Sequence, residues 1–546
     1  MNRTPSLRWR AAAAAAVLYV VLIQPNHPAA LGWGALTAFP LEWPVVLLAL
    51  VASGGTRAGQ VLRLLLVAVL VLIAILKTAD FAMFTALGRG FDPIADLALV
   101  EAGLRLLGAA TGPVLAVLAV SGALLAAVGL AAALWWATHV WSAVAPAGIA
   151  RRGTAAVAAL LCAGVATAEI GQALGRWELP AAPPGAAFTA RVGVERVERI
   201  RATLADLRTF EAAAARDPFA DAAALLDRLD RDLLAVFLES YGRASLDGDR
   251  YAGLHRATLA AAEADLAARG LATASGLLAS PTRGGQSWLA HATFANGLWV
   301  DGQTRYGAVL ASSRPTLWHL ARRAGFHTAA VMPQITLDWP ESSRMGFETI
   351  LAADDLGYAG PTFNWVTMPD QFTYAALDRE LREDRSDDRP LFAQVATGSS
   401  HAPWVPVPEL VPWETLGDGR VFEPMAAAGE APEVVWRDRE RVRDQYGRAL
   451  DYALRTVLAW AGRHAGDPPL LIVLGDHQAA GFVALDERPD VPIHVIGPAR
   501  LVERAAADWD LDPGLLPADD APVVPMDRMR DRILTTFTRA RRTGEG

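Results

Sequence analysis

This sequence has little that supports disulfide bonds or a strongly charged surface. The chain of 546 residues holds a single cysteine, Cys162, so no disulfide can form within it. Charged residues make up only 20% of the chain, below the roughly 25% that is typical of soluble domains. Lysine is rare, no run is rich in lysine or arginine, and the net charge is −8. These absences argue against a nucleic-acid partner.

Apolar residues are abundant instead. They make up 53% of the chain, and the mean hydropathy is +0.24, which excludes a disordered chain and disfavours a purely cytosolic enzyme. A membrane helix needs about 20 mostly apolar residues, and a bundle of core helices in a soluble protein is the alternative to a membrane domain. We expect about five transmembrane helices, built on the apolar stretches 11–23, 36–53, 64–76, 113–150 and 154–168.

Arginine placement predicts how these helices are oriented. Arginines flank alternate connections and should therefore share the cytoplasmic side: Arg3, Arg8, Arg10, Arg57, Arg63, Arg151 and Arg152. Five crossings then put everything after residue 170 outside. The first helix could instead be a cleaved signal peptide, with the same outcome for the later residues. Abundant alanine and arginine indicate a GC-rich bacterial gene. We therefore expect the membrane to be the bacterial cytoplasmic (inner) membrane, with residues 1–170 as the multi-pass domain within it.

The rest of the chain divides into a linker and a large domain. Residues 171–228 are predicted to be a linker, with prolines at 180–184 and a helical segment from about 192 to 230. In residues 229–546, short apolar runs alternate with helical segments, which predicts an α/β domain with a largely parallel central sheet covered on both faces. The predicted strands are 233–238, 329–332, 391–396, 470–474 and 493–496.

Polar side chains follow three of these strands. Glu239 follows the first, His401 comes after 391–396, and Asp476 and His477 follow 470–474. The carboxyl ends of parallel strands form the usual ligand site of such sheets. Carboxylate oxygens and imidazole together suit a divalent cation such as Mn²⁺, Zn²⁺ or Mg²⁺. Each residue alone could instead be a helix cap or a solvated loop residue.

A candidate nucleophile follows a glycine pair. Ser287 comes after Gly284 and Gly285 and opens a predicted helix over 288–294, where amides and the helix dipole favour an anion. A bound metal would lower the pKa of its hydroxyl; the alternative is a simple N-cap. His291 lies one turn later and either faces the site or packs beneath it. Arginines that could face a substrate anion, or only solvent, are Arg283, Arg314 and Arg344.

Together these motifs resemble the lipoteichoic acid synthases and related phosphoglycerol transferases of the alkaline phosphatase/sulfatase superfamily. The matching segments are 238–242 (Leu-Glu-Ser-Tyr-Gly), the turn with Ser287, 339–347, 399–404 (Ser-Ser-His-Ala-Pro-Trp) and 475–477 (Gly-Asp-His). The resemblance implies an alkaline phosphatase-like ectodomain and one divalent metal, Mn²⁺ in the first place, with Zn²⁺ or Mg²⁺ as alternatives. The implied ligands are Glu239, Ser287, Asp476 and His477. Ser287 would be the metal-bound nucleophile, and the implied substrate contacts are His401, Arg344 and Trp339.

The resemblance implies a function as well. It is that of a membrane-anchored phosphoglycerol or phospho-headgroup transferase, with phosphatidylglycerol as donor and a glycan or other hydroxyl as acceptor. The synthases have threonine where this chain has Ser287, and alkaline phosphatases have serine. Residues 279–283 have Ala279 at the reactive position of the sulfatase signature, which argues against a formylglycine sulfatase. The alternatives are a hydrolase of phosphodiesters, phosphate esters or sulfate esters, and a non-catalytic membrane sensor or scaffold.

Overall fold

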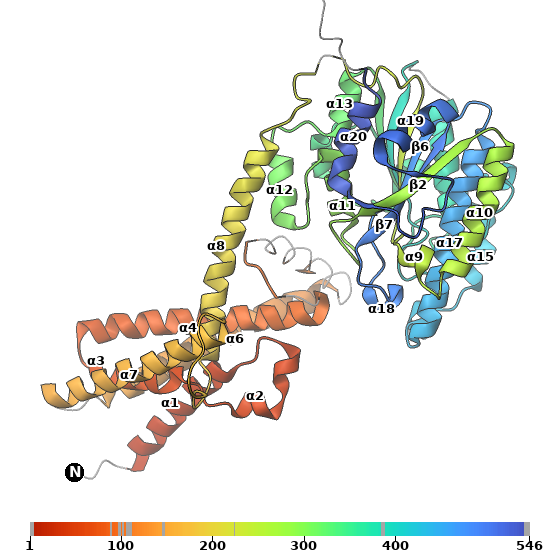
Figure 1. Cartoon of the computed structure of the whole chain (residues 1–546). Helices are drawn as coiled ribbons and strands as arrows, with labels where there is room; N and C mark the ends of the chain where they lie inside the picture. Colours follow the sequence, from red (N-terminus) through yellow and green to blue (C-terminus); the bar gives the residue numbers. More distant parts are fainter. Residues whose placement is uncertain are drawn as a thin grey trace, which may run out of the picture. The chain divides into compact units, whose positions relative to one another are not determined.

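The computed structural model describes residues 5–87, 90–94, 96, 100, 103–104, 112–144, 148–222, 224–383 and 388–539. The chain divides into two units, Met1–Asp206 and Leu207–Gly546. The regular elements described in the first unit are all helices, and the second unit contains a large sheet (Figure 1). Helix α8 (Phe188–Ala214) runs from the first unit into the second.

The first unit forms helices at all five predicted apolar stretches. Three of its described helices, α4, α6 and α7, are long and apolar enough to cross a membrane. Helix α3 is apolar but has only 12 residues. Membrane-spanning character is therefore found for three helices, and the predicted number of about five is not confirmed. The helices are α1 (Pro5–Ile23), α2 (Trp33–Thr37), α3 (Glu42–Ser53), α4 (Arg57–Leu87), α6 (Pro113–Ala143) and α7 (Ile149–Ala173).

Buried charges fix the start of α8 within the first unit. Arg196 Nη2 lies 2.6 Å from Asp80 Oδ1 of α4, and Lys77 Nζ donates to Thr189 Oγ1 at 2.7 Å. All four side chains are less than a tenth exposed. Charges among apolar helices are costly unless they are paired, so these contacts hold the first turns of α8 against α4.

The second unit contains a nine-stranded mixed sheet that is mostly parallel. Its order is β4-β3-β5-β1-β6-β7-β2-β8, with β9 paired to β2. All five predicted strands are present, as β1, β3, β5, β6 and β7. The strands are β1 (Leu233–Leu238), β2 (Ala272–Ala279), β3 (His327–Met332), β4 (Thr349–Ala352), β5 (Leu391–Ala396), β6 (Leu470–Gly475), β7 (Asp490–Gly497), β8 (Asp512–Pro513) and β9 (Val523–Pro525).

One side of the sheet departs from the parallel arrangement. Strand β7 is antiparallel to both β6 and β2. The connection 476–489 contains only the four-residue helix α18 (Gly481–Ala484), so it stays at the carboxyl end of β6 and β7 runs back from there. A parallel return would need a longer crossover to the opposite edge. Strand β2 was not predicted, because its alanines and glycine have low strand preference.

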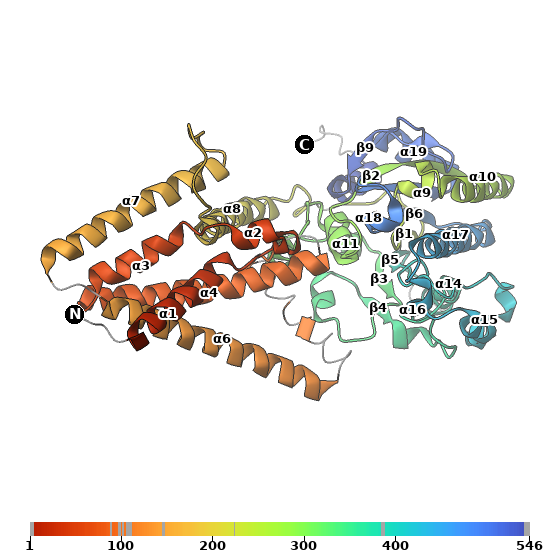
Figure 2. The ribbon, with the colours of Figure 1, turned by 90° about the horizontal axis from the view of Figure 1, so that it is seen from below.

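Helices cover both faces of the sheet (Figure 2). Strand β1 shows why both are apolar: Leu234, Val236 and Leu238 pack into the core under α10, α14 and α17, whereas its alternate residues pack into the core under α11, α13, α19 and α20. The first set is α10 (Ala252–Ala268), α14 (Asp370–Leu377) and α17 (Arg439–Arg463). The second is α11 (Ser287–Asn296), α13 (Leu317–Arg323), α19 (Ala499–Trp509) and α20 (Met529–Thr536). Shorter helices are α9 (Ala244–Asp247), α12 (Gln303–Ala311), α15 (Glu423–Ala428) and α16 (Pro432–Val435).

Candidate metal centre

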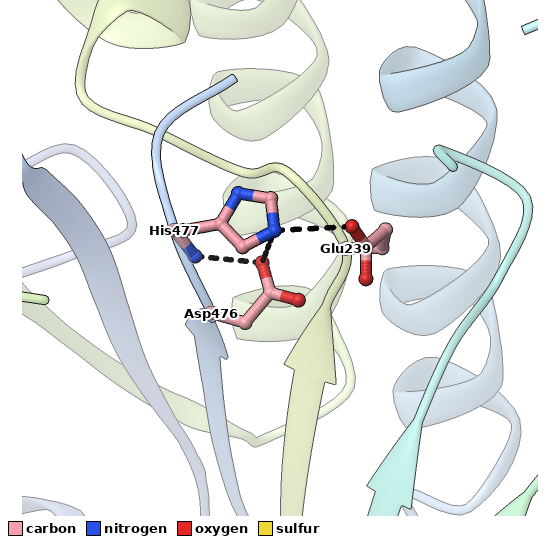
Figure 3. Close-up of side chains that lie close together, drawn as sticks. All are labelled: Glu239, Asp476 and His477. Carbon is pink, nitrogen blue, oxygen red and sulfur yellow. Dashed lines mark hydrogen bonds and ion pairs between the residues drawn. The ribbon is translucent and has the colours of Figure 1, made fainter. Parts of the chain in front are cut away.

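Acidic and imidazole side chains meet at the centre of the sheet's carboxyl edge. Strands β1 and β6 are parallel neighbours with Leu238 opposite Gly475, so Glu239 and Asp476 leave the sheet side by side. Ligand atoms of Glu239, Asp476 and His477 lie within 4.8 Å of one another (Figure 3). The structure thus brings together three residues that the sequence placed at this edge.

Backbone hydrogen bonds orient the two residues after β6. The amides of Ser240 and His477 donate to Asp476 Oδ1 at 2.8 and 2.6 Å. His477 Nδ1 lies 3.0 Å from the Gln478 carbonyl, which can only accept, so Nδ1 carries a proton. Nε2 therefore faces the carboxylates, 3.2 Å from Glu239 Oε1 and 3.8 Å from Asp476 Oδ1.

The three groups shift one another's protonation. Burial raises the pKa of Asp476, and the Glu239 carboxylate adds to the rise. Burial alone would lower the pKa of His477, but the carboxylates of Asp476 and Glu239 outweigh it and raise that pKa to about 9. Burial also opposes ionisation of Glu239, yet the facing His477 imidazole holds its pKa well below the usual range. Without a metal, the cluster therefore retains a proton at His477 Nε2.

This donor set fits a divalent cation. An imidazole lone pair and a carboxylate oxygen 3.2 Å apart repel unless a proton or a cation lies between them. Two carboxylates and one imidazole are ligands that Mn²⁺, Zn²⁺ and Mg²⁺ accept in proteins. The Gln478 carbonyl at Nδ1 is the kind of outer contact that fixes a metal-binding histidine. Glu239, Asp476 and His477 would hold the ion.

Ser287 supplies a hydroxyl beside this cluster. Its Oγ donates to Glu239 Oε2 at 2.9 Å and lies 3.3 Å from His477 Nε2. Ser287 is the first residue of α11, and the capping position belongs to Gln286, whose side chain makes no cap hydrogen bond. Gln286 has a left-handed backbone, with φ of 66°, and follows Gly285 at 139°. Since side chains rarely adopt this conformation, the turn positions Ser287 at some conformational cost.

The loop after β5 brings His401 near the same edge. The charge of His401 is one of the causes that lower the Glu239 pKa. Asp370 at the start of α14 accepts from the Gly398 and Ser399 amides, both at 2.9 Å, and so holds the start of this loop. His401 therefore lies close enough to the cluster for its charge to act on Glu239.

The described contacts of Trp339 and Arg344 are with residues outside the cluster. The Trp339 ring is 6.3 Å from the Phe347 ring, and Arg344 Nη1 donates to the Leu310 carbonyl at 3.3 Å. Among the described residues, neither forms a hydrogen bond or ion pair with the acidic cluster or Ser287. The other two candidate arginines are also engaged elsewhere: Arg283 donates to the Glu487 carbonyl, and Arg314 to that of Asn296.

Two further side chains form hydrogen bonds with the backbone carbonyls of Glu239 and Ser240, directly after β1. Ser400 Oγ donates to the Glu239 carbonyl at 2.7 Å, and the Tyr446 hydroxyl of α17 donates to the Ser240 carbonyl at 2.9 Å. Ser400 adjoins His401 in the sequence, but nothing in the sequence connects Tyr446 to β1. His291 packs 4.3 Å from the Phe237 ring, and burial lowers its pKa to about 4. It therefore lies beneath the site as a neutral side chain.

One family model matches part of the chain. Residues 234–488 match the Sulfatase family model, a span that contains all but the first residue of β1, together with Ser287 and the two residues after β6. No curated protein matches the chain. Residues 234–488 are therefore similar to the Sulfatase family over a little under half of the chain.

Among the solved structures to which the chain is similar are three bacterial proteins. Lipoteichoic acid synthase LtaP from Listeria monocytogenes is 13% identical, with 59% of this chain and 76% of that chain covered and a TM-score of 0.37. The periplasmic domain of phosphoethanolamine transferase EptC from Campylobacter jejuni is 12% identical. The match covers 57% of this chain and 91% of that chain, with a TM-score of 0.36. Phosphoglycerol transferase GacH from Streptococcus pyogenes, in complex with sn-glycerol-1-phosphate, is 13% identical. The match covers 62% of this chain and 92% of that chain, with a TM-score of 0.36.

Proposed function

We propose that this protein is a membrane-anchored, metal-dependent phosphoglycerol transferase that uses Ser287 as its nucleophile. The observation that carries the proposal is the Ser287 hydroxyl, which donates to Glu239 at 2.9 Å inside a cluster of two carboxylates and an imidazole. A serine that served only as a helix cap would direct its oxygen to the amides of α11 instead.

The first half of the reaction forms a bond to Ser287. Its Oγ attacks the phosphorus of the donor phosphodiester, the bond from phosphorus to the diacylglycerol oxygen breaks, and the hydroxyl proton leaves along the contact with Glu239 Oε2. A divalent ion on Glu239, Asp476 and His477 would supply positive charge beside the Ser287 oxygen and the phosphoryl oxygens. The dipole of α11 favours the same negative charge. Diacylglycerol takes up a proton as it departs.

The second half of the reaction returns the serine. An acceptor hydroxyl attacks the phosphorus, the bond to Ser287 Oγ breaks, and Ser287 Oγ takes up the proton that the acceptor loses, so the phosphoglycerol group moves to the acceptor. Phosphoryl transfer depends mostly on such positioning and on charge stabilisation. His401 is the proposed contact to the phosphoryl oxygens. Trp339 and Arg344 remain predicted substrate contacts.

We propose phosphatidylglycerol as the donor and a glycan or other hydroxyl as the acceptor. LtaP and GacH, whose folds are similar, are named for lipoteichoic acid synthesis and phosphoglycerol transfer. The apolar helices α4, α6 and α7 would hold the domain at the outer face of a bacterial cytoplasmic membrane, which raises the effective concentration of a lipid donor. Mn²⁺ is the proposed metal, and a similar phosphoethanolamine transferase domain, from Escherichia coli, is described in complex with Zn.

The test uses the purified full chain in detergent with headgroup-labelled phosphatidylglycerol and Mn²⁺. We expect metal-dependent release of diacylglycerol that Ser287→Ala abolishes. The exposed Ser343→Ala serves as the matched control and should release diacylglycerol at the wild-type rate. Label that passes only to water, with an acceptor glycan present, would identify a hydrolase instead. Equal release by Ser287→Ala would contradict the proposed nucleophile.

A further inference from the structure

Exposed large apolar side chains of the second unit gather at the edge of the sheet that carries the metal centre. Most of them lie in the loops after β3, β4 and β6, at the start of α11 or just before α17: Trp288, Leu337, Trp365, Val434, Trp436, Phe482 and Leu485. Among the described residues, none lies in the loops before β1, β5 and β6 at the opposite edge. Single exposed apolar side chains are ordinary, but their concentration at one edge indicates a contact surface.

Three of these side chains, Trp436, Phe482 and Leu485, form what we name the apolar rim patch. Phe482 lies in α18, and Leu485 directly follows that helix. Both belong to the connection that begins with Asp476 and His477, and α18 projects from this edge of the sheet (Figure 1). The Trp436 ring lies 6.2 Å from the Phe482 ring. The patch therefore lies within a few residues of two metal ligands.

The backbone at Leu485 indicates that its side chain serves a contact outside the domain. Leu485 ends α18 in the left-handed conformation, with φ of 57°. Glycine is the usual residue at such a helix end, because a large side chain makes this conformation costly. The Leu485 side chain is nevertheless 60% exposed, so packing within the domain does little to offset the cost. Contact with an apolar partner would offset it.

A stack of aromatic rings holds the patch in place. The Trp436 ring stacks on the buried Trp404 ring, with 5.7 Å between centroids and 5° between planes. Trp436 Nε1 donates to the Pro403 carbonyl at 3.2 Å, and Trp404 Nε1 donates to the Ser400 carbonyl at 2.7 Å. The patch is therefore fixed to the loop that carries His401.

The surroundings of the patch favour a lipid surface as the partner. Acidic and basic side chains are mixed beside it, as Arg-Asp-Arg-Glu in 437–440 and Asp-Glu-Arg in 486–488, so no field of one sign would attract a strongly charged macromolecule. Tryptophan, phenylalanine and leucine are the residues that enter the boundary between lipid headgroups and acyl chains. The same chain contains three helices long and apolar enough to cross a membrane, so a bilayer is present wherever this domain is.

We propose that the carboxyl edge of the sheet docks on the lipid bilayer through the apolar rim patch. Phe482 and Leu485 enter the boundary between headgroups and acyl chains, and Trp436 lies at the level of the headgroups. Apolar burial supplies the attachment, so added salt should change it little. The docking stands independently of the reaction proposed at Ser287.

The test measures contact between a fluorophore and lipid in the full chain, reconstituted in nanodiscs of phosphatidylcholine and phosphatidylglycerol. In a Cys162→Ala background, Leu485→Cys carries a nitrobenzoxadiazole label, and some of the phosphatidylcholine carries a nitroxide near the headgroup. The control label is at Asp467→Cys, an exposed position before β6 at the opposite edge of the sheet. We expect the nitroxide lipid to quench the label at 485 about twofold or more beyond the label at 467.

A charge placed in the patch should weaken the docking. Phe482→Asp should lower the quenching at 485 about twofold or more, because a carboxylate is costly among acyl chains. Val523→Asp is the matched control, since Val523 lies on β9 and is 37% exposed, the same fraction as Phe482. It should leave the quenching at 485 at the level of the labelled parent.

Equal quenching at 485 and 467, or equal effects of Phe482→Asp and Val523→Asp, would overturn the proposal. Loss of the quenching on addition of salt would also overturn it, because the attachment would then be electrostatic. A label at 485 that is shielded from water already in detergent, in a particle with the mass of two chains, would identify a second copy of this chain as the occupant instead. The comparison of the two label positions leaves Trp436 and Phe482 unchanged, so it decides the matter even if Phe482→Asp unfolds.

Discussion

The metal affinity of the cluster formed by Glu239, Asp476 and His477 should rise steeply with pH. The two carboxylates raise the pKa of His477 to about 9, so at neutral pH its Nε2 holds a proton where a metal ligand needs a lone pair. Metal binding must displace this proton. Burial also raises the pKa of Asp476, so metal binding displaces a second proton, from Asp476, over part of the pH range.

The size of the effect follows from the proton count. Displacement of one proton makes the apparent Kd fall tenfold for each pH unit below the pKa of His477, about 1.4 kcal/mol per unit. From pH 6 to pH 8 this amounts to about a hundredfold, or ~2.7 kcal/mol. A contribution from Asp476 steepens the slope further.

The assay is a calorimetric titration with Mn²⁺ at pH 6, 7 and 8, in two buffers of different ionisation enthalpy. The difference between the buffers counts the protons released, and we expect at least one per ion. Ser287→Ala keeps the three ligands and should show the same slope. An affinity that does not change between pH 6 and pH 8, or binding with no proton release, would refute the reasoning about His477 Nε2.

Three further predictions concern stability. In metal-free protein, the raised pKa of His477 adds stability that is complete below the unfolded value of about 6.5 and is lost as pH rises towards 9; a Tm that climbs over this range would contradict it. Asp370→Ala leaves the Gly398 and Ser399 amides unpaired and should cost about 3 kcal/mol in urea unfolding, whereas the exposed Asp354→Ala should be close to neutral. Phe237→Ala leaves a cavity in the core beneath α11 and should lower the free energy of unfolding by about 3–5 kcal/mol. A loss under about 1 kcal/mol would show that neighbouring side chains move to fill the cavity, against this prediction.

The centre of the sheet and its polar edge could be predicted from sequence because their signals are local. Strands β1 and β6 are continuous apolar runs, buried on both faces, and each ends directly before an acid. Parallel neighbours bring such ends together without further information. The placement of Glu239, Asp476 and His477 at one edge therefore follows from two strand predictions and one topology rule.

The remaining features depend on tertiary structure. The reversal of β7 depends on where the connection 476–489 lies, and its sequence does not show this. Strand β2 is rich in alanine, and only its neighbours make it a strand. The role of Arg344 at the substrate stays a prediction from resemblance. Its turn packs beside α13, where Thr316 Oγ1 donates to the Met345 carbonyl at 2.5 Å, and the sequence does not show this contact. Side chains in long loops have no register that a periodic pattern could reveal.

The covalent step at Ser287 is tested most directly by peptide mass spectrometry of the full chain quenched in acid during turnover. With phosphatidylglycerol and Mn²⁺, the peptide that contains Ser287 should gain the mass of one phosphoglycerol group, and fragmentation should place that mass on Ser287. The gain should be absent with a chelator and in Ser287→Ala. An unmodified Ser287 peptide in a sample that releases diacylglycerol at the full rate would contradict the nucleophile, and a gain on another residue would reassign it.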